Sequence, residues 1–117
     1  MDEPQKTIEN LLLELRRGTV VLSVLSQLTT PKYGYSLVQS LEGKGVPVEA
    51  GTLYPLLRRL EKQGLLKSEW ETSGPKPRKY YVMSREGREV YERLCSEWGH
   101  MVKSMDALLN DGGKNNG

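Results

Sequence analysis

The sequence predicts a mainly α-helical fold with one small β-hairpin and a long C-terminal helix. Three observations support this fold class. Leucine-rich segments with helical spacing fill the first half of the chain, a strand-like alternation follows residue 64, and a further helical pattern begins near residue 85. The chain has 117 residues, enough for one domain with one modest core. Its 37% hydrophobic and 27% charged residues are typical of a folded globular protein rather than a disordered one.

Two helices are expected before residue 29. The first runs from Thr7, its predicted N-cap, to Leu15, and its apolar residues recur at intervals of three and four on one face. The second lies within TVVLSVLSQL, residues 19–28, which has almost no polar face and is therefore expected in the middle of the fold. The polar ends of the chain, 1–6 and 111–117, are expected to be frayed or disordered.

Two more helices follow, separated by turns. TTPKYG at 29–34 has the composition of a turn, a helix is expected from Gly34 to Leu41, and EGKGVP ends it. The next helix lies within GTLYPLLRRLEKQGLL at 51–66. Pro55 is compatible with a helix that begins near residue 50, because N–H groups in the first turn have no intrahelical partner. Gly64 is expected to end this helix as a C-terminal cap.

A hairpin and the long helix complete the chain. Polar and apolar side chains alternate in LLKSEWET, SGPKP forms a turn, and RKYYVM is a second segment rich in strand-forming residues. Ser84 is the predicted N-cap of the last helix, with Glu86 in its first turn. This helix is expected from residue 85 to about residue 110.

The last helix has an apolar seam that so small a body cannot cover. Its residues alternate spacings of three and four, as the a and d positions of a coiled coil do. Because the helix would be about 37 Å long, it should project from the body and pair with a second copy of the chain. The expected dimer interface combines this seam with the apolar face of the first helix: Tyr91, Leu94, Trp98, Met101, Met105 and Leu108 with Ile8, Leu11, Leu12 and Leu15.

Compact helices followed by a two-stranded hairpin describe a winged helix-turn-helix, in which the helix at 51–66 enters the major groove of DNA. Residues 1–84 would form this domain, 85–110 the dimerisation helix and 111–117 a disordered tail. The net charge is only +2, but residues 52–82 contain seven Lys or Arg against three acidic residues. Opposite its leucines the helix presents polar and basic residues, and the hairpin adds a basic tip that could grip phosphate or the minor groove. The candidate DNA-binding residues are Thr52, Tyr54, Pro55, Arg58, Arg59, Lys62, Lys76, Arg78 and Lys79.

Other functional classes have less support. Cys95 and His100 are the only Cys and His, too few for a Cys/His metal site in one chain, and no acid, base and nucleophile are placed together as in an enzyme. No cofactor or metal is expected. A single cysteine excludes an internal disulfide, no segment resembles a secretory signal, and no apolar run approaches the roughly 20 residues that span a bilayer. These features favour a cytoplasmic protein without a membrane partner.

Two alternatives remain open at this point. The basic residues could form an ordinary solvated face, and the domain would then be a winged-helix module for protein–protein docking; cations on both the helix and the hairpin favour DNA. Trp98 could be a simple packing residue of the seam. Near a two-fold axis it would instead face its own copy, and the two rings could form a slot for a small aromatic or hydrophobic effector.

Four segments resemble the PadR family of bacterial transcriptional regulators, specifically its short members with one C-terminal helix: LRRGTVVLSVL (15–25), YGYSLVQSL (33–41), GTLYPLLRRLEKQGLL (51–66) and RKYYVMSREG (78–87). The resemblance implies a homodimeric repressor that binds a palindromic operator and is often released by a small phenolic or hydrophobic compound. It also implies that Tyr35, Thr52, Tyr54 and Arg58 lie at or near DNA, with Arg78 and Lys79 on the wing. Trp98 falls where some members that bind flat aromatic compounds also have a tryptophan.

Overall fold

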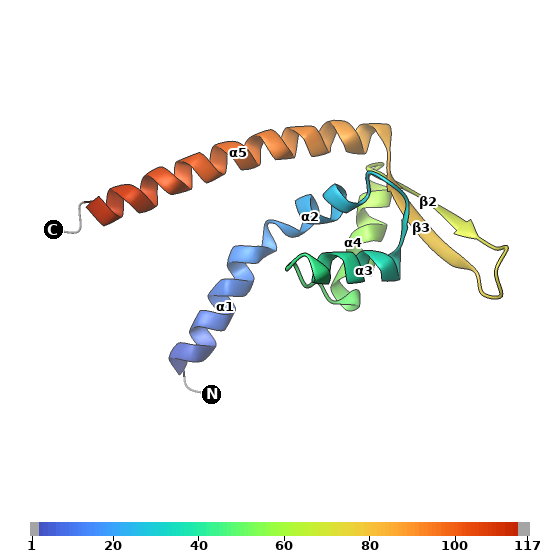
Figure 1. Cartoon of the computed structure of the whole chain (residues 1–117), viewed down its shortest axis with the longest axis horizontal. Helices are drawn as coiled ribbons and strands as arrows, with labels where there is room; N and C mark the ends of the chain where they lie inside the picture. Colours follow the sequence, from blue (N-terminus) through green and yellow to red (C-terminus); the bar gives the residue numbers. More distant parts are fainter. Residues whose placement is uncertain (1–2, 115–117) are drawn as a thin grey trace.

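The computed structural model describes residues 3–114 and has the predicted order of helices, with a hairpin before the last one (Figure 1). Helices α2, α3 and α4 and a small sheet form a body, from which α1 and α5 extend as two diverging arms. The predicted class, mainly α with a small β element in a winged helix-turn-helix, is confirmed. The elements are α1 (Glu3–Arg17), α2 (Val20–Gln27), β1 (Lys32–Tyr33), α3 (Gly34–Gly43), α4 (Ala50–Lys62), β2 (Leu66–Glu71), β3 (Arg78–Met83) and α5 (Arg85–Lys114).

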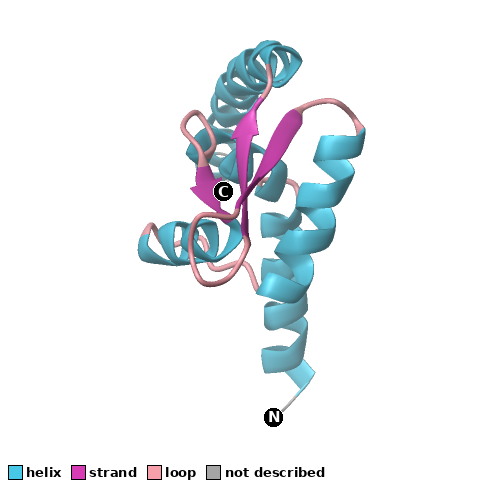
Figure 2. Cartoon of the chain, turned by 90° about the vertical axis from the view of Figure 1, so that its right-hand side faces the viewer, coloured by secondary structure: helices cyan, strands magenta, loops and turns pink. Residues whose placement is uncertain are grey.

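The sheet has a third strand that the sequence did not predict. Strand β1 pairs antiparallel with β3, with Lys32 opposite Tyr81 and Tyr33 opposite Tyr80, so the strand order is β1-β3-β2 (Figure 2). The prediction of a simple turn at 29–34 is therefore wrong for Lys32 and Tyr33. The free edge of β3 has backbone groups that need hydrogen-bond partners, and the extended segment before α3 supplies them.

The core lies between α2, α3, α4 and the inner face of the hairpin. The apolar face predicted for the fourth helix is buried, and Leu53 and Leu57 have no exposed surface. Helix α2 lies in the middle of the fold as expected, with Val24 and Leu25 fully buried. Packing of leucines from consecutive helices therefore fixes the position of α4, whose other side remains at the surface.

Both arms extend further than predicted. Helix α1 begins at Glu3, so Thr7 lies inside the helix and the prediction of Thr7 as its N-cap is wrong. Pro4 is tolerated because it falls in the first turn, and the carboxylate of Glu3 favours the positive end of the helix dipole. Helix α5 runs through Lys114, so its last turn includes residues expected in the tail, whereas 115–117 lie outside the described residues, as do Met1 and Asp2.

Hydrogen bonds join the segment that ends α4 to the start of α5. Gly64 has a φ of 82°, and its N–H and that of Leu65 donate to the carbonyls of Glu61 and Leu60, which confirms the predicted glycine cap. The Ser84 hydroxyl donates to the Gly64 carbonyl (2.6 Å) and accepts from the N–H of Gly87 (3.0 Å), which confirms Ser84 as the cap of α5. A Cβ on Gly87 would lie 2.0 Å from the Leu65 carbonyl oxygen, so this close approach requires glycine.

The arms make the chain much less compact than its length requires. The radius of gyration is 17.8 Å, whereas about 13 Å is expected for a compact domain of this length. The accessible surface is 8821 Å², whereas a compact monomer of this mass exposes about 6,400 Å². The surplus surface therefore belongs mainly to two amphipathic helices that project from the body.

Within the described residues, no helix is both long enough and apolar enough to cross a membrane.

Replacing Ser84 tests the α4–α5 fastening. We expect Ser84→Ala to lower the free energy of unfolding by about 1–2 kcal/mol, because it removes a helix cap and a hydrogen bond to the Gly64 carbonyl. Ser96→Ala, at an exposed position farther along α5, should change it by less than about 0.5 kcal/mol. Urea denaturation at one fixed protein concentration measures both. Equal effects of the two substitutions would contradict this role of Ser84.

Candidate nucleic-acid interface

The exposed side of α4 presents the cluster of cations predicted from the sequence. Its leucines face the core, and Arg58, Arg59 and Lys62 are exposed on the other side together with Thr52 and Pro55. In the part of the chain that the structure describes, none of the three cations forms an ion pair. Their charges are therefore available to an anionic partner.

Tyr54 connects this surface to the start of α3. Its ring is half-buried and packs directly against Gly34, where a Cβ would lie 2.4 Å from ring atom Cε1. The absence of a side chain at Gly34 thus allows the start of α3 to approach the flank of α4. Tyr35 lies next to this contact and is exposed, and α3 begins without a side-chain cap. The structure therefore brings Tyr35 and Tyr54, predicted from separate helices, into one region.

The outer face of the hairpin, the side turned away from α4, carries polar and aromatic side chains. The Arg78 guanidinium lies 4.4 Å from the centre of the Tyr33 ring, and this ring meets Tyr80 edge to face. The Tyr80 hydroxyl donates to Glu69 (2.9 Å), and this bond raises the pKa of Tyr80 above its ordinary value. Strand β1 thus supplies an aromatic ring that fixes the position of Arg78, a contact that the sequence did not predict.

Hydrogen bonding also affects a carboxylate near the hairpin turn. The hydroxyl and the backbone N–H of Ser73 both donate to Glu71, and they hold the pKa of Glu71 below its ordinary value, with a further contribution from the charge of Arg78. Glu71 is opposite Arg78 in the strand register. The outer face of the wing therefore contains acidic as well as basic groups. Lys76 lies in the turn between the two strands and is exposed.

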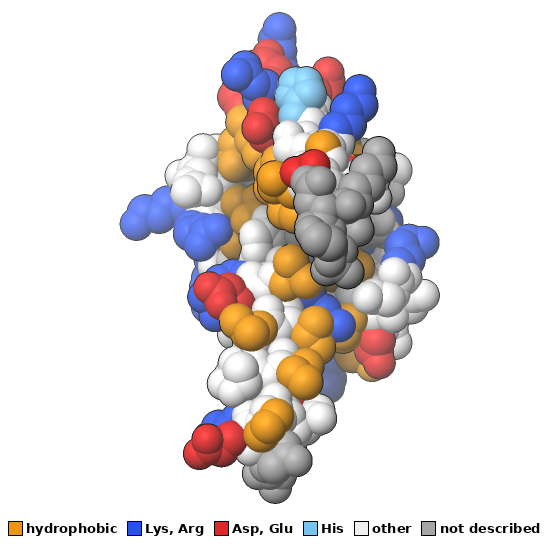
Figure 3. Space-filling view, turned by 90° about the vertical axis from the view of Figure 1, so that its left-hand side faces the viewer, with side chains coloured by type: hydrophobic (Ala, Val, Ile, Leu, Met, Phe, Trp, Pro, Cys, Tyr) orange, Lys and Arg blue, Asp and Glu red, His pale blue; other side chains and the backbone are white. Residues whose placement is uncertain are grey.

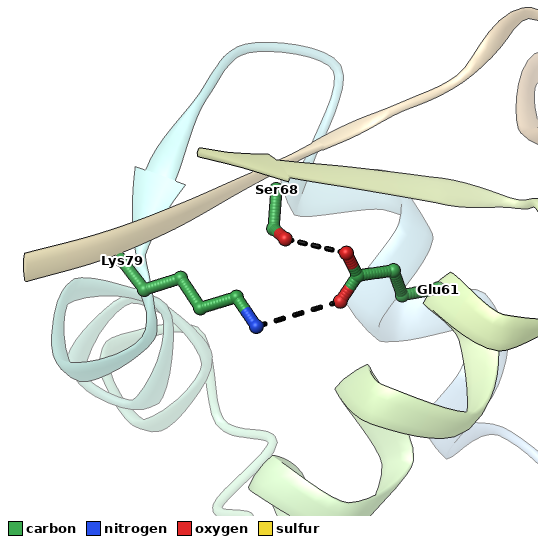
Figure 4. A network of polar contacts seen from close by, with 3 residues as sticks. All are labelled: Glu61, Ser68 and Lys79. Atoms are coloured by element: carbon green, nitrogen blue, oxygen red, sulfur yellow. Dashed lines mark hydrogen bonds and ion pairs between the residues drawn. The ribbon is translucent and has the colours of Figure 1, made fainter. Parts of the chain in front are cut away.

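Lys79 lies on the inner face of the hairpin, toward α4 (Figure 4). Its Nζ is 3.6 Å from Oε1 of Glu61, whose other oxygen accepts a hydrogen bond from Ser68. The Lys79 side chain is 30% exposed. Of the three cations predicted on the wing, Lys76 and Arg78 are thus exposed, while Lys79 is paired with an acidic residue of α4.

Trp70 is an exposed aromatic residue that the functional prediction omitted. It lies on β2 directly opposite Lys79 and is 61% exposed. The alternation in LKSEWE, which puts Trp70 on the same side as Leu66 and Ser68, could have indicated that it faces α4. Trp70 therefore belongs to the wing surface nearest the helix.

The residues predicted at a dimer interface lie on the two arms. Tyr91 and Leu94 are partly buried against the chain's own core, whereas the others are exposed, and α1 buries none of its residues. Viewed from the side to which the arms point, hydrophobic side chains run along α1 and reappear beside α5 (Figure 3).

A hydrogen bond with the Cys95 thiol raises the pKa of Tyr91 above its ordinary value. Among the described residues, no three His, Cys, Asp or Glu side chains are grouped as metal ligands would be.

Known proteins resemble this chain in both sequence and fold. The sequence model of the PadR-like family of transcriptional regulators matches residues 21–93. Transcriptional regulator Rv3488 of Mycobacterium tuberculosis is 38% identical over 76 residues, which are 64% of this chain and 71% of that protein. The crystal structure of a PadR family transcriptional regulator from Eggerthella lenta has 51% sequence identity and a TM-score of 0.85, covering 90% of this chain and 94% of that chain. Bacillus subtilis PadR, crystallised in complex with operator DNA, shares the fold, with a TM-score of 0.61 and 18% identity over 66% of this chain and 45% of that one.

Proposed function

The chain belongs to the PadR-like family of transcriptional regulators, and from this we propose that it acts as a homodimeric repressor that binds a palindromic operator in DNA. The observation that carries the proposal is the group of unpaired cations on the exposed side of α4, in a body whose core fixes that helix. The complex of Bacillus subtilis PadR with operator DNA supports DNA as the partner of this shared fold.

Helix α4 would enter the major groove, because its exposed side carries the residue types that contact bases and phosphates. Arg58, Arg59 and Lys62 supply positive charge, and Thr52, Tyr54 and Pro55 line the entering end. The N–H groups at the start of α3, beside Tyr35, suit a phosphate. Lys76 and Arg78 would bind the backbone next to the groove from the wing, while Lys79, the third cation predicted on the wing, neutralises the charge of Glu61.

The second copy would cover the arms. The surface in excess of a compact monomer is about 2,400 Å² per chain, more than the roughly 800 Å² that each partner buries in a standard interface. The predicted interface residues that are exposed in the single chain would pack across a two-fold axis: Ile8, Leu11, Leu12, Leu15, Trp98, Met101, Met105 and Leu108. The two α4 helices would then meet half-sites about one helical turn, or 34 Å, apart.

A docking module without DNA specificity is the competing function. It requires an exposed surface for another protein but has no need for unpaired cations on α4 and further cations at the wing. The proposed function therefore requires sequence preference as well as affinity. If the protein binds DNA from upstream of its own gene no better than unrelated DNA, the docking function is favoured.

Arg58 tests the DNA surface. We expect Arg58→Ala to weaken operator binding about tenfold or more, because it removes one direct DNA contact, without changing the oligomeric state. Arg93→Ala provides the matched control, since Arg93 is an exposed cation on α5, and it should change affinity by less than about twofold. Fluorescence anisotropy with labelled operator DNA measures both affinities. Similar losses in the two variants would argue against α4 as the recognition helix.

Substitutions at two adjacent leucines of α1, Leu12 and Leu13, test the proposed dimer interface. We expect sedimentation of the wild type at twice the chain mass of 13.2 kDa, and dissociation in Leu12→Glu because a carboxylate would be buried at the interface. Leu13 lies on the opposite side of α1 and is also exposed, so Leu13→Glu should remain dimeric. A monomeric wild type, or equal dissociation of both variants, would contradict this interface.

An effector site at Trp98 is a second proposal, because Trp98 is half-exposed within the apolar seam of α5. A small phenolic or planar aromatic compound should quench the tryptophan fluorescence of the wild type by stacking on this ring. Trp98→Ala should abolish the quenching, whereas Trp70→Ala, which leaves the seam unchanged, should retain it. Quenching that persists in Trp98→Ala would place the compound elsewhere.

A further inference from the structure

Glu61 is the one acidic residue of α4 and lies on the flank that faces the hairpin, next to the exposed cations of this helix. It lies one helical turn beyond Arg58, and its side chain is 34% exposed. An unpaired carboxylate at this place would repel phosphate. Both of its oxygens are engaged, however, one by the Ser68 hydroxyl of β2 and the other by Lys79 of β3. Glu61 therefore joins the recognition helix to both strands of the wing (Figure 4).

The ammonium group of Lys79 is held from several sides. Besides Glu61, it lies 5.3 Å from the centre of the Tyr81 ring and 5.9 Å from that of Trp70. Tyr81 is buried, and Trp70 is opposite Lys79 in the strand register. A carboxylate and two aromatic faces stabilise a cation in this position. Lys79 is consequently turned toward α4, in contrast to Lys76 in the exposed turn.

We propose that Glu61 is a positioning residue for DNA binding, which pins the wing to the recognition helix and withholds Lys79 from the phosphate backbone. The inference rests on the proposed DNA-binding function. Lys79 thus binds Glu61 instead of a DNA phosphate. The ion pair gives up one non-specific phosphate contact, and it fixes the angle between the wing and α4. Lysine contacts to phosphate strengthen binding to any sequence, so withholding one favours specificity.

The salt dependence of binding distinguishes a phosphate contact from a positioning contact. Each phosphate neutralised in B-DNA contributes about −0.9 to the slope of log affinity against log salt concentration. The experiment compares the wild-type chain with Glu61→Gln, Lys79→Gln, Lys76→Gln and the double variant Glu61→Gln, Lys79→Gln, on operator and unrelated DNA. Glutamine at 61 keeps an oxygen that can accept from Ser68 and removes only the charge, so the fold is disturbed as little as the chain allows.

Four results are expected. Lys79→Gln leaves the slope of the wild type unchanged, because no phosphate contact is lost and the Ser68 hydroxyl still holds the Glu61 carboxylate toward the wing. It lowers operator affinity about threefold to tenfold, because the wing is held less firmly. Lys76→Gln makes the slope shallower by about 0.9. Glu61→Gln makes the slope steeper by about 0.9, because Lys79 is then free to bind phosphate. The same substitution lowers the ratio of operator affinity to affinity for unrelated DNA. The double variant Glu61→Gln, Lys79→Gln returns to the wild-type slope.

A shallower slope in Lys79→Gln, equal to that in Lys76→Gln, would overturn the inference, because Lys79 would then contact phosphate directly. An unchanged slope and specificity ratio in Glu61→Gln would overturn it as well. These failures are distinct from failure of the proposed function, which would appear as a lack of sequence preference in the wild type itself.

Discussion

The contact between the end of α4 and the start of α5 is the constraint on which the other functional features depend. The Ser84 hydroxyl bonds the carbonyl of Gly64, which lies just after the end of α4, and the N–H of Gly87 in α5, and the absence of a side chain at Gly87 lets α5 approach the backbone of Leu65 closely. The exposed cations of α4 and the apolar seam of α5 are therefore held in a fixed relation within one chain. In the proposed dimer, pairing of the α5 arms would set the separation of the two α4 helices, since each α5 is joined to the end of its own α4 at this point.

The hairpin is attached to the body on both of its faces, by different chemistry. On the inner face, Lys79 and Ser68 bind Glu61 of α4. On the outer face, Arg78 packs on Tyr33, the residue that precedes α3. The wing is thus held against α4 on one face and against the residue that precedes α3 on the other. In the proposed complex its cations consequently have unequal roles: the exposed ones would contact DNA, and Lys79 would contribute through the position of the wing.

Local signals were sufficient to predict most of the fold. Leucines at helical spacing indicated the buried face of α4, and the chemistry of Gly64 and Ser84 marked where one helix ends and another begins. Non-local contacts were not predictable in this way. Strand β1 is only two residues long and pairs with a strand far along the chain, and the Glu61–Lys79 pair joins elements whose relative placement depends on the whole core. The helical period alone was enough to predict which side chains of α4 are exposed. The orientation of the Lys79 side chain could be known only from the tertiary structure.

Hydroxyl-radical footprinting on DNA from upstream of the protein's own gene tests most directly whether two α4 helices act together. A dimer whose arms fix the recognition helices should protect two segments on one face of the duplex, with centres about one helical turn, or 34 Å, apart. The protection should be lost from both segments together when the dimer is disrupted. A single protected segment, or uniform protection without preferred positions, would contradict a two-fold regulator built on the α4–α5 junction.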